Sequence, residues 1–332
     1  MTIRSFLPSA TRPLDAETAA AAFAAIFDGD AEAEEIASFL IEMAERGETA
    51  AEIAACATAM RARMVPVAAP EGAIDVCGTG GDAQHSLNIS TAVAIVVAAA
   101  GVPVAKHGNR AASSKAGAAD TLEALGLDLD IASATAERSL ADLGIAFLFA
   151  QKHHPALAPL APIRRAIGRR TVFNMVGPIC NPAGVKRQLI GVARPDFLSV
   201  YAEALELLGT EAALLVGGDE PLDELSIAGP STMVRVGATG SGSERITPED
   251  AGLAAHPLDA VRGDDAAYNA AALRRLLQGE SGAYRDAVLL NAAAALMVAG
   301  RAETLTEGAE EAGEVLDNGL ANALLDCWIA YR

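Results

Sequence analysis

The stretch from residue 74 to residue 105 limits the possible folds more than any other part of the chain. Residues 74–77 form a short, mostly apolar run that stops at a glycine, which predicts a buried strand. Residues 89–100 are apolar around nearly the whole helical circumference, so they predict a buried helix with Asn88 as its N-cap. Residues 102–105 predict a second strand. A strand, a helix and a strand in direct succession indicate a mostly parallel α/β sheet.

A glycine-rich loop, residues 78–82, separates the first strand from the helix. Its three glycines tolerate positive φ and let a ligand approach the backbone without a Cβ in the way. The unpaired N–H groups at the start of the helix would point toward this loop, and such a helix N-terminus binds anions. Four polar residues follow the end of the second strand and are expected to lie near the glycine-rich loop: Lys106, His107, Asn109 and Arg110. We therefore expect a phosphate site here, contacted by Lys106 and Arg110.

The rest of the chain predicts a helical start followed by further α/β structure. Residues 15–63 hold three amphipathic helices that would form a small bundle. We expect them at 16–27, at 32–46 and from a capping box at Thr49 and Glu52 to about residue 64, and residues 65–70 are a linker. Prolines divide residues 151–184 into short helices and turns. Further helices are expected at 118–125, 134–143, 197–208, 264–278, 287–299, 307–317 and 320–331. Further strands are expected at 145–149, 189–192, 212–216 and, as an edge strand before a polar turn at 237–243, at 233–236.

Composition narrows the class of partner. A net charge of −18 opposes nucleic acid, so an anion must bind where basic residues gather, as Lys106, Arg110 and Lys115 do. The four cysteines are far apart and form no CxxC pair, which favours free buried thiols in a reducing cytoplasm. The N-terminal residues lack the apolar core of a signal peptide, and residues 91–105 are too short to span a bilayer. We expect a soluble, cytoplasmic protein.

Other patterns fit the same residues less well. The spacing of the glycines matches a dinucleotide-binding fingerprint, but residues 84–87 delay the helix and no acidic residue follows about twenty positions later. A plain tight turn remains an alternative for a lone run of glycines. The sequence has neither a P-loop nor a G-x-S-x-G elbow. The pair His153 and His154 lacks the further ligands that zinc requires.

Asp223 and Glu224 are adjacent carboxylates in a loop that follows a buried strand. Standing alone they would be solvated surface charges. Beside a phosphate site they have another use, because Mg²⁺ binds one or two carboxylates together with phosphate oxygens. Ser90, at the start of the buried helix, would supply a further oxygen ligand.

Four blocks of sequence, at residues 78–82, 88–91, 106–110 and 113–117, resemble the anthranilate phosphoribosyltransferase family of tryptophan biosynthesis in order and spacing. The resemblance extends over nearly the whole chain. It implies an α/β fold in which a small all-helical N-terminal domain precedes a larger domain with a mixed, mainly parallel central sheet flanked by helices. It also implies a Mg²⁺-dependent pentosyltransferase. Such an enzyme moves the 5-phosphoribosyl group of phosphoribosyl pyrophosphate (PRPP) to the amino group of anthranilate and releases pyrophosphate.

The resemblance also implies roles for individual residues. Anthranilate would contact Gly78, Asn109 and Arg164, with His107, His154 and Gly177 near its entry path. Magnesium would be held by Ser90, Asp223 and Glu224. No residue is assigned as a general base. PRPP would contact Gly78, Gly81, Asp82, Ser86, Asn88, Ile89, Ser90, Thr91, Lys106, His107, Gly108, Asn109, Arg110, Ala111, Ala112, Ser113, Ser114 and Ala118.

The implied helical domain is residues 1–68, with residues of about 155–187 folding back onto it, and the implied PRPP-binding domain is 69–154 and 188–332. Members of the family are usually homodimers through the helical domain. The chain departs from the family at Gly217, where many members have histidine, and at Ala118, where serine or threonine is common.

Two other functions remain open at this stage. A pyrimidine nucleoside phosphorylase shares the fold and also handles an anomeric carbon and phosphate, but the paired carboxylates favour the more highly charged pyrophosphate substrate. A nucleic-acid-binding relative without transferase activity would need a basic surface groove, which the net charge of −18 opposes.

Overall fold

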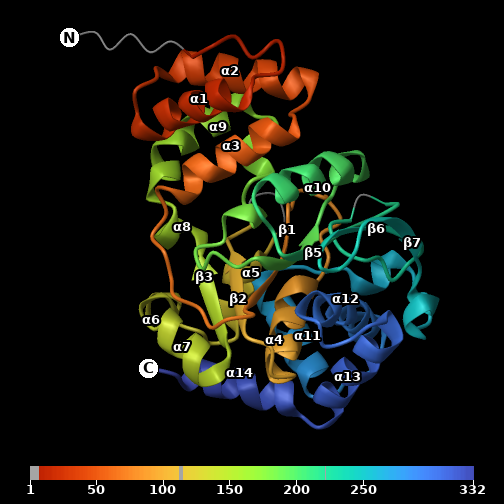
Figure 1. Ribbon diagram of the computed structural model, residues 1–332. Coiled ribbons are helices and arrows are strands. Elements are labelled where there is room, and N and C mark those ends of the chain that lie inside the picture. The colour runs from red at the N-terminus through yellow and green to blue at the C-terminus, as the bar shows by residue number, and fades with distance from the viewer. Residues whose placement is uncertain (1–6, 112–114, 221) are drawn as a thin grey trace.

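The computed structural model describes residues 7–111, 115–220 and 222–332. A helical bundle stands above a larger α/β body (Figure 1). The bundle consists of α1 (Ala16–Asp28), α2 (Ala33–Arg46) and α3 (Ala50–Arg61), close to the predicted bounds. The linker after it is held in place, since the N–H of Val65 donates to the carbonyl of His153.

Polar contacts at the helix starts hold the bundle together. Asp15 caps α1 by accepting a hydrogen bond from the Thr18 N–H. Thr49 and Glu52 form the predicted capping box of α3. The fully buried Glu52 also accepts from the Leu14 N–H and pairs with Arg46 at the end of α2, so one carboxylate joins three segments.

Within the described residues the sheet has seven strands in the order β3-β2-β1-β4-β5-β6-β7. The strands from β3 to β5 are parallel, and β6 and β7 are antiparallel to their neighbours. This confirms the mixed, mainly parallel sheet. Its strands are β1 (Ile74–Gly78), β2 (Val104–Gly108), β3 (Ile145–Phe149), β4 (Arg187–Gly191), β5 (Ala212–Gly218), β6 (Ser231–Gly237) and β7 (Gly242–Ile246).

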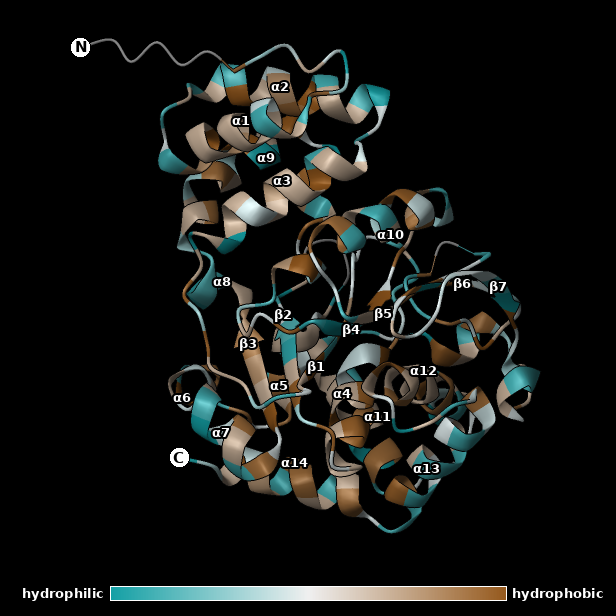
Figure 2. Ribbon diagram, viewed as in Figure 1, coloured by the Kyte–Doolittle hydropathy of each residue, from teal (hydrophilic) through white to brown (hydrophobic). Residues whose placement is uncertain are grey.

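Helices cover both faces of the sheet (Figure 1), and Figure 2 colours β3 and α4 mainly hydrophobic. One core cluster contains Leu189 and Leu214 from the strands together with the buried helix α4 (Ile89–Ala99). The opposite face, which includes Ile190 and Leu215, packs on α10 (Leu198–Leu207) and continues into the bundle. The other α-helices are α5 (Ala118–Ala124), α6 (Leu129–Ala134), α7 (Ala136–Leu143), α8 (Ala150–His153), α9 (Ala161–Ile167), α11 (Ala266–Leu277), α12 (Ala283–Ala299), α13 (Leu305–Asp317) and α14 (Leu320–Ala330).

Residues 155–187 return from the sheet to the bundle, as Figure 1 shows for α9 beside α2. Prolines shorten this segment into α9 and 3-10 turns at Pro155–Leu160, Val172–Asn174 and Pro178–Cys180. Its apolar side chains belong to the same core cluster as those of α1 and α2, for example Phe173 against Phe27 with ring centroids 5.7 Å apart.

Several expectations were wrong in detail. The strand expected at 233–236 is not an edge strand, because the polar turn expected at 237–243 leads into β7, which forms the edge. The helix α6 was missed, since its six residues are too few to show a period. Cys56, Cys77 and Cys180 are free and buried as expected, whereas Cys327 is exposed. No helix of the described ranges has both the length and the apolar character needed to cross a membrane.

The contact between α12 and α13 gives a test of the packing. A Cβ added to Gly308 would lie 2.7 Å from the Cα of Ala293, so Gly308→Ala forces the two helices apart. Overpacking of this kind costs about 1–3 kcal/mol. In the same helix, Gly313 meets nothing closer than an Arg285 nitrogen at 3.8 Å. Gly313→Ala is therefore expected to leave stability unchanged or to raise it by up to about 1 kcal/mol. Urea denaturation of both variants distinguishes these outcomes, and equal effects would contradict the packing described.

Candidate active site

The candidate active site lies where the strand order changes direction. The chain builds β1, β2 and β3 outward on one side and β4 and β5 on the other, so β1 and β4 meet at the centre. Ligands of such sheets bind in the crevice at this point. The loop after β5 crosses it and places Asp223 against both central strands. A Cβ at Gly78 would lie 2.1 Å from Asp223 Oδ2, and one at Gly191 would lie 1.5 Å from the Asp223 carbonyl oxygen. The two strands must therefore end in glycine.

The acidic loop concentrates negative charge in a region of low solvent access. Asp223 Oδ2 accepts a hydrogen bond of 2.7 Å from the Gly80 N–H. Burial, with the nearby Asp82 carboxylate adding to it, raises the pKa of Asp223 to about 7. Burial and then the charge of Asp223 raise the pKa of Glu224 well above its usual range, while Lys106 acts in the opposite direction.

These residues fit a hard divalent cation. Two neighbouring carboxylates repel each other when ionised, so a cation between them relieves the cost of burying both. The Ser90 N–H donates to Glu224, which brings the predicted third ligand beside the pair. The described residues contain no group of three or more His, Cys, Asp or Glu side chains that could hold a metal by themselves. The set therefore suits Mg²⁺ shared with substrate phosphate.

Lys106 lies inside β2, so the prediction that it follows the end of the strand was wrong. Its side chain is 2% exposed, and its Nζ donates to the Val76 carbonyl at 2.8 Å and to Ser90 Oγ at 3.3 Å. From the sequence alone, a charged residue after an apolar run predicts that the strand has ended. Here β2 continues because the ammonium group reaches the N-terminus of α4.

The start of α4 also differs from the expectation. Asn88 stands at the N-cap position, but its side chain does not cap the helix. Its Oδ1 accepts from Thr121 Oγ1 at 2.6 Å and from Asn269 Nδ2 at 3.0 Å, so it joins α4 to α5 and α11. The Ser90 N–H, expected to be free for an anion, donates to Glu224.

The basic residues do not all converge on the glycine loop. Arg110 pairs with Asp120 and Glu123, and Lys115 pairs with Asp264. Only Lys106, of the three predicted cations, points at the crevice. The partners of Arg110 lie one helix later in the chain, and no local pattern reveals them.

Three of the residues expected near the entry path of anthranilate lie close together: His107, His154 and Gly177. The rings of His107 and His154 approach with their Nε2 atoms 3.2 Å apart, and His107 Nδ1 lies 3.1 Å from the Gly177 carbonyl. Burial lowers the pKa of His107 to about 3 and that of His154 to about 4, so both are neutral at physiological pH. Arg164 is half-buried, with its guanidinium carbon 5.7 Å from the centre of the Phe173 ring, and burial lowers its pKa.

The other predicted residues lie around the same crevice or outside the described part. Asn109 Oδ1 lies 3.5 Å from Gln151 Nε2. Gly108 packs on Phe147, whose ring would stand 2.6 Å from an added Cβ. Gly81 lies in the glycine loop, and Ser86 lies between that loop and α4. Ile89 and Thr91 are in the first turn of α4, Ala118 begins α5, and the Ala111 N–H donates to Asp120 of α5. Ala112, Ser113 and Ser114 fall outside the described residues. At Gly217 a Cβ would lie 2.6 Å from the Val192 carbonyl oxygen, so the glycine found here suits its surroundings.

Two further residues next to the site were not anticipated. Asp75 is fully buried in β1 and accepts from the His107 N–H at 3.0 Å and from Asn181 Nδ2 at 2.8 Å. It thereby joins the return segment to β1 and β2. Arg170 lies beyond the end of α9 and donates to the Gly80 carbonyl. The available signal for Asp75 was a carboxylate in an otherwise apolar strand.

Comparison with known proteins agrees with this architecture. The chain matches the glycosyl transferase family's helical bundle domain over residues 9–64 and its a/b domain over residues 70–322. The protein therefore belongs to this glycosyl transferase family.

The most similar proteins found within this family share one activity. The chain is 62% identical over 325 residues to the anthranilate phosphoribosyltransferase of Sphingopyxis alaskensis, covering 98% of each chain. The anthranilate phosphoribosyltransferase structure from Thermus thermophilus superposes with a TM-score of 0.92 at 44% identity, covering 96% of each. The Saccharomyces cerevisiae enzyme in complex with PRPP and Mg superposes at 0.85 with 28% identity, covering 96% of this chain and 93% of the other.

The raised pKa values of the acidic pair predict how stability depends on pH without Mg²⁺. Folding takes up protons where the folded carboxyls are protonated and the unfolded ones, with pKa values of about 4, are not. The free energy of unfolding should therefore fall as the pH rises through about 5 to 8. The double variant Asp223→Asn, Glu224→Gln should lose part of this slope and gain stability over wild type most clearly at the alkaline end. Urea denaturation across this range tests the prediction, and identical slopes would contradict it.

Proposed function

We propose that the protein transfers the 5-phosphoribosyl group of PRPP to the amino group of anthranilate, giving N-(5-phosphoribosyl)anthranilate and pyrophosphate, in tryptophan biosynthesis. The main support is the pair Asp223 and Glu224, of which Glu224 is buried. The pair faces the glycine loop, the start of α4 and Lys106 together. The near full-length similarity to anthranilate phosphoribosyltransferases supports the same reaction.

PRPP would occupy the crevice between the glycine loop and the end of β2. Lys106 is the strongest phosphate contact, because its charge is buried and a charge-assisted hydrogen bond gains strength away from water. Ser90 and Thr91 would add hydroxyl groups at the start of α4. Arg110 would join the site by exchanging its carboxylate partners for phosphate, since both ion pairs are solvent-exposed and weak.

Anthranilate would bind beside the pair His107 and His154. Arg164 comes from the return segment and has no carboxylate partner among the described residues. A guanidinium can grip the anthranilate carboxylate through two parallel hydrogen bonds. The neutral imidazoles add no competing charge.

Mg²⁺ would be held by Asp223, Glu224 and Ser90 with oxygens of PRPP, and its charge would stabilise the departing pyrophosphate. In the reaction the bond between ribose C1 and the pyrophosphate oxygen breaks, and the anthranilate nitrogen forms a new bond to C1. Lys106 and the oriented N–H groups of the loop favour the negative charge that develops on the leaving oxygens. The amine then loses a proton, for which no general base is assigned.

We also propose that residues 1–68 and about 155–187 form the helical domain, with 69–154 and 188–332 as the PRPP-binding domain. The shared core of the return segment and the bundle supports this division. A cytoplasmic homodimer formed through the helical domain completes the proposal. Sedimentation at micromolar concentration would reveal the dimer.

The activity itself is tested by following the loss of anthranilate fluorescence. Fluorescence should fall only when enzyme, PRPP and Mg²⁺ are all present, and pyrophosphate should appear in equal amount. No loss of fluorescence under these conditions would overturn the proposed function.

Replacing Lys106 tests the phosphate site. Lys106→Gln should raise the KM for PRPP by about ten- to a hundredfold, because a charge-assisted contact is lost, and change that for anthranilate little. Lys115→Gln is the matched control, since Lys115 is exposed and pairs with Asp264. An equal rise of both KM values would show a general disturbance of the loop instead.

Replacing Arg164 tests the acceptor site. Arg164→Ala should raise the KM for anthranilate by roughly tenfold or more, because the carboxylate loses its cationic partner. The KM for PRPP should stay nearly constant. Arg165→Ala, on the same helix but exposed, should leave both unchanged. If Arg164→Ala instead raised only the KM for PRPP, the residue would belong to the phosphate site.

A further inference from the structure

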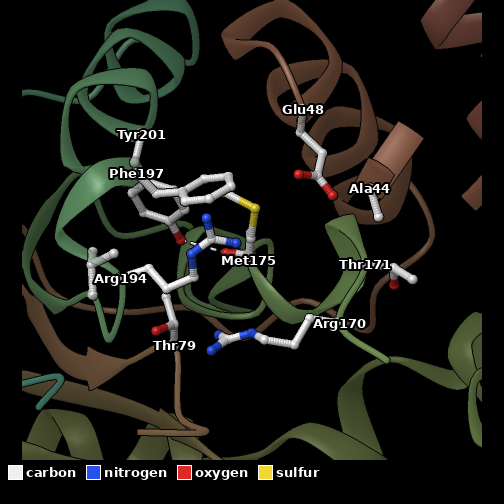
Figure 3. Close-up of a pocket in the computed structure, with 10 residues that line it drawn as sticks. Ala44, Glu48, Thr79, Arg170, Thr171, Met175, Arg194, Phe197 and Tyr201 are labelled. Carbon is white, nitrogen blue, oxygen red and sulfur yellow. Dashed lines mark hydrogen bonds between the residues drawn. The ribbon is translucent and has the colours of Figure 1, made fainter. Parts of the chain in front are cut away.

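A cavity separates the helical bundle from the C-terminal edge of the sheet, on the side of β4 and α10 (Figure 3). It opens to solvent, and its empty volume with that open space included is about 450 Å³. It lies at the loops after β1 and β4, where the strand order reverses and open α/β sheets bind ligands. None of its lining residues is among those assigned above to PRPP, anthranilate or metal. They are Ala44, Glu48, Thr79, Arg170, Thr171, Met175, Val192, Arg194, Phe197 and Tyr201.

One wall of the cavity is apolar and rigid. Met175, Val192 and Tyr201 are buried side chains that face it. The Tyr201 hydroxyl donates to the Met175 carbonyl, as the dashed line in Figure 3 shows, so this polar group is already satisfied. The wall therefore offers an apolar surface without a free donor.

Two cations stand at the sheet side of the cavity. Arg194 stacks on Phe197, its guanidinium carbon 4.1 Å from the ring centre, and Arg170 is held by its bond to the Gly80 carbonyl. Figure 3 shows both guanidinium groups directed into the space. Arg194 also pairs with Asp196, but the two side chains are 52% and 61% exposed, so this ion pair holds the guanidinium only weakly.

An anion faces them from the bundle. Glu48 is 9% exposed, and Figure 3 shows its carboxylate pointing down into the cavity. Among the described residues it forms no ion pair. Burial raises the pKa of Glu48, and the charge of Arg194 is the leading side-chain influence that lowers it. A cationic ligand group would supply the partner that this carboxylate lacks.

We propose that the cavity binds a small zwitterion of the α-amino acid type with an apolar side chain. Its carboxylate would meet Arg194 and Arg170, its ammonium group would meet Glu48, and its side chain would lie against Met175 and Phe197. A ligand with only one charge leaves either the buried carboxylate without a cationic partner or the two guanidinium groups without an anion from the ligand. Because its contacts come from both the bundle and the α/β body, such a ligand would bridge the two parts of the molecule.

Calorimetric titration with three related probes tests the site. L-phenylalanine carries both charges, 3-phenylpropanoate lacks the ammonium group and phenethylamine lacks the carboxylate. We expect L-phenylalanine to bind at least about tenfold more tightly than either analogue, the usual effect of one charge-assisted contact. Saturating anthranilate should not displace it. Absence of L-phenylalanine binding at millimolar concentration, or displacement by anthranilate, would overturn the proposal.

Two variants identify the contacts. Arg194→Ala should weaken both carboxylate-bearing probes. Glu48→Gln should weaken L-phenylalanine by about tenfold but leave 3-phenylpropanoate unchanged, a selective effect that misfolding does not produce. Arg165→Ala is the control cation outside the cavity and should change neither. Equal weakening of both probes by Glu48→Gln would show that the carboxylate does not contact the ammonium group.

Discussion

The packing of the acidic loop on the ends of the two central strands governs the whole site. Asp223 lies so close to Gly78 and Gly191 that a single Cβ at either position would overlap it. The same contact sets Asp223 beside the glycine loop and Glu224 beside the start of α4. The proposed phosphate contacts and the proposed cation site both depend on this placement.

Local sequence was sufficient to predict much of the framework. An apolar run before a glycine gave β1, an all-round apolar segment gave α4, and the capping box at Thr49 gave the start of α3, because each signal acts within a few neighbouring residues. The resemblance of four short blocks to one family gave the reaction, and the full-length relatives agree with it. The individual site residues remain proposals.

The side-chain positions that could not be predicted depend on contacts with residues far away in the sequence. Lys106 was predicted to follow a strand, whereas it is buried inside β2. Its burial depends on hydrogen bonds to Val76 and Ser90, which are distant from it in the sequence. Lys115 is turned away by Asp264, a residue 149 positions later. The interdomain cavity likewise combines Glu48, Arg170 and Arg194, which have no shared local pattern. Contacts of this kind are fixed by tertiary packing and not by periodicity.

The central claim is that the acidic pair and the phosphate site act as one unit joined by a cation. Calorimetric titration of PRPP with and without Mg²⁺ tests it most directly. We predict tight binding of PRPP only when Mg²⁺ is present, and weak binding of Mg²⁺ alone, because two carboxylates and a hydroxyl leave its coordination incomplete. Equal affinity for PRPP with and without Mg²⁺ would contradict this account of the site.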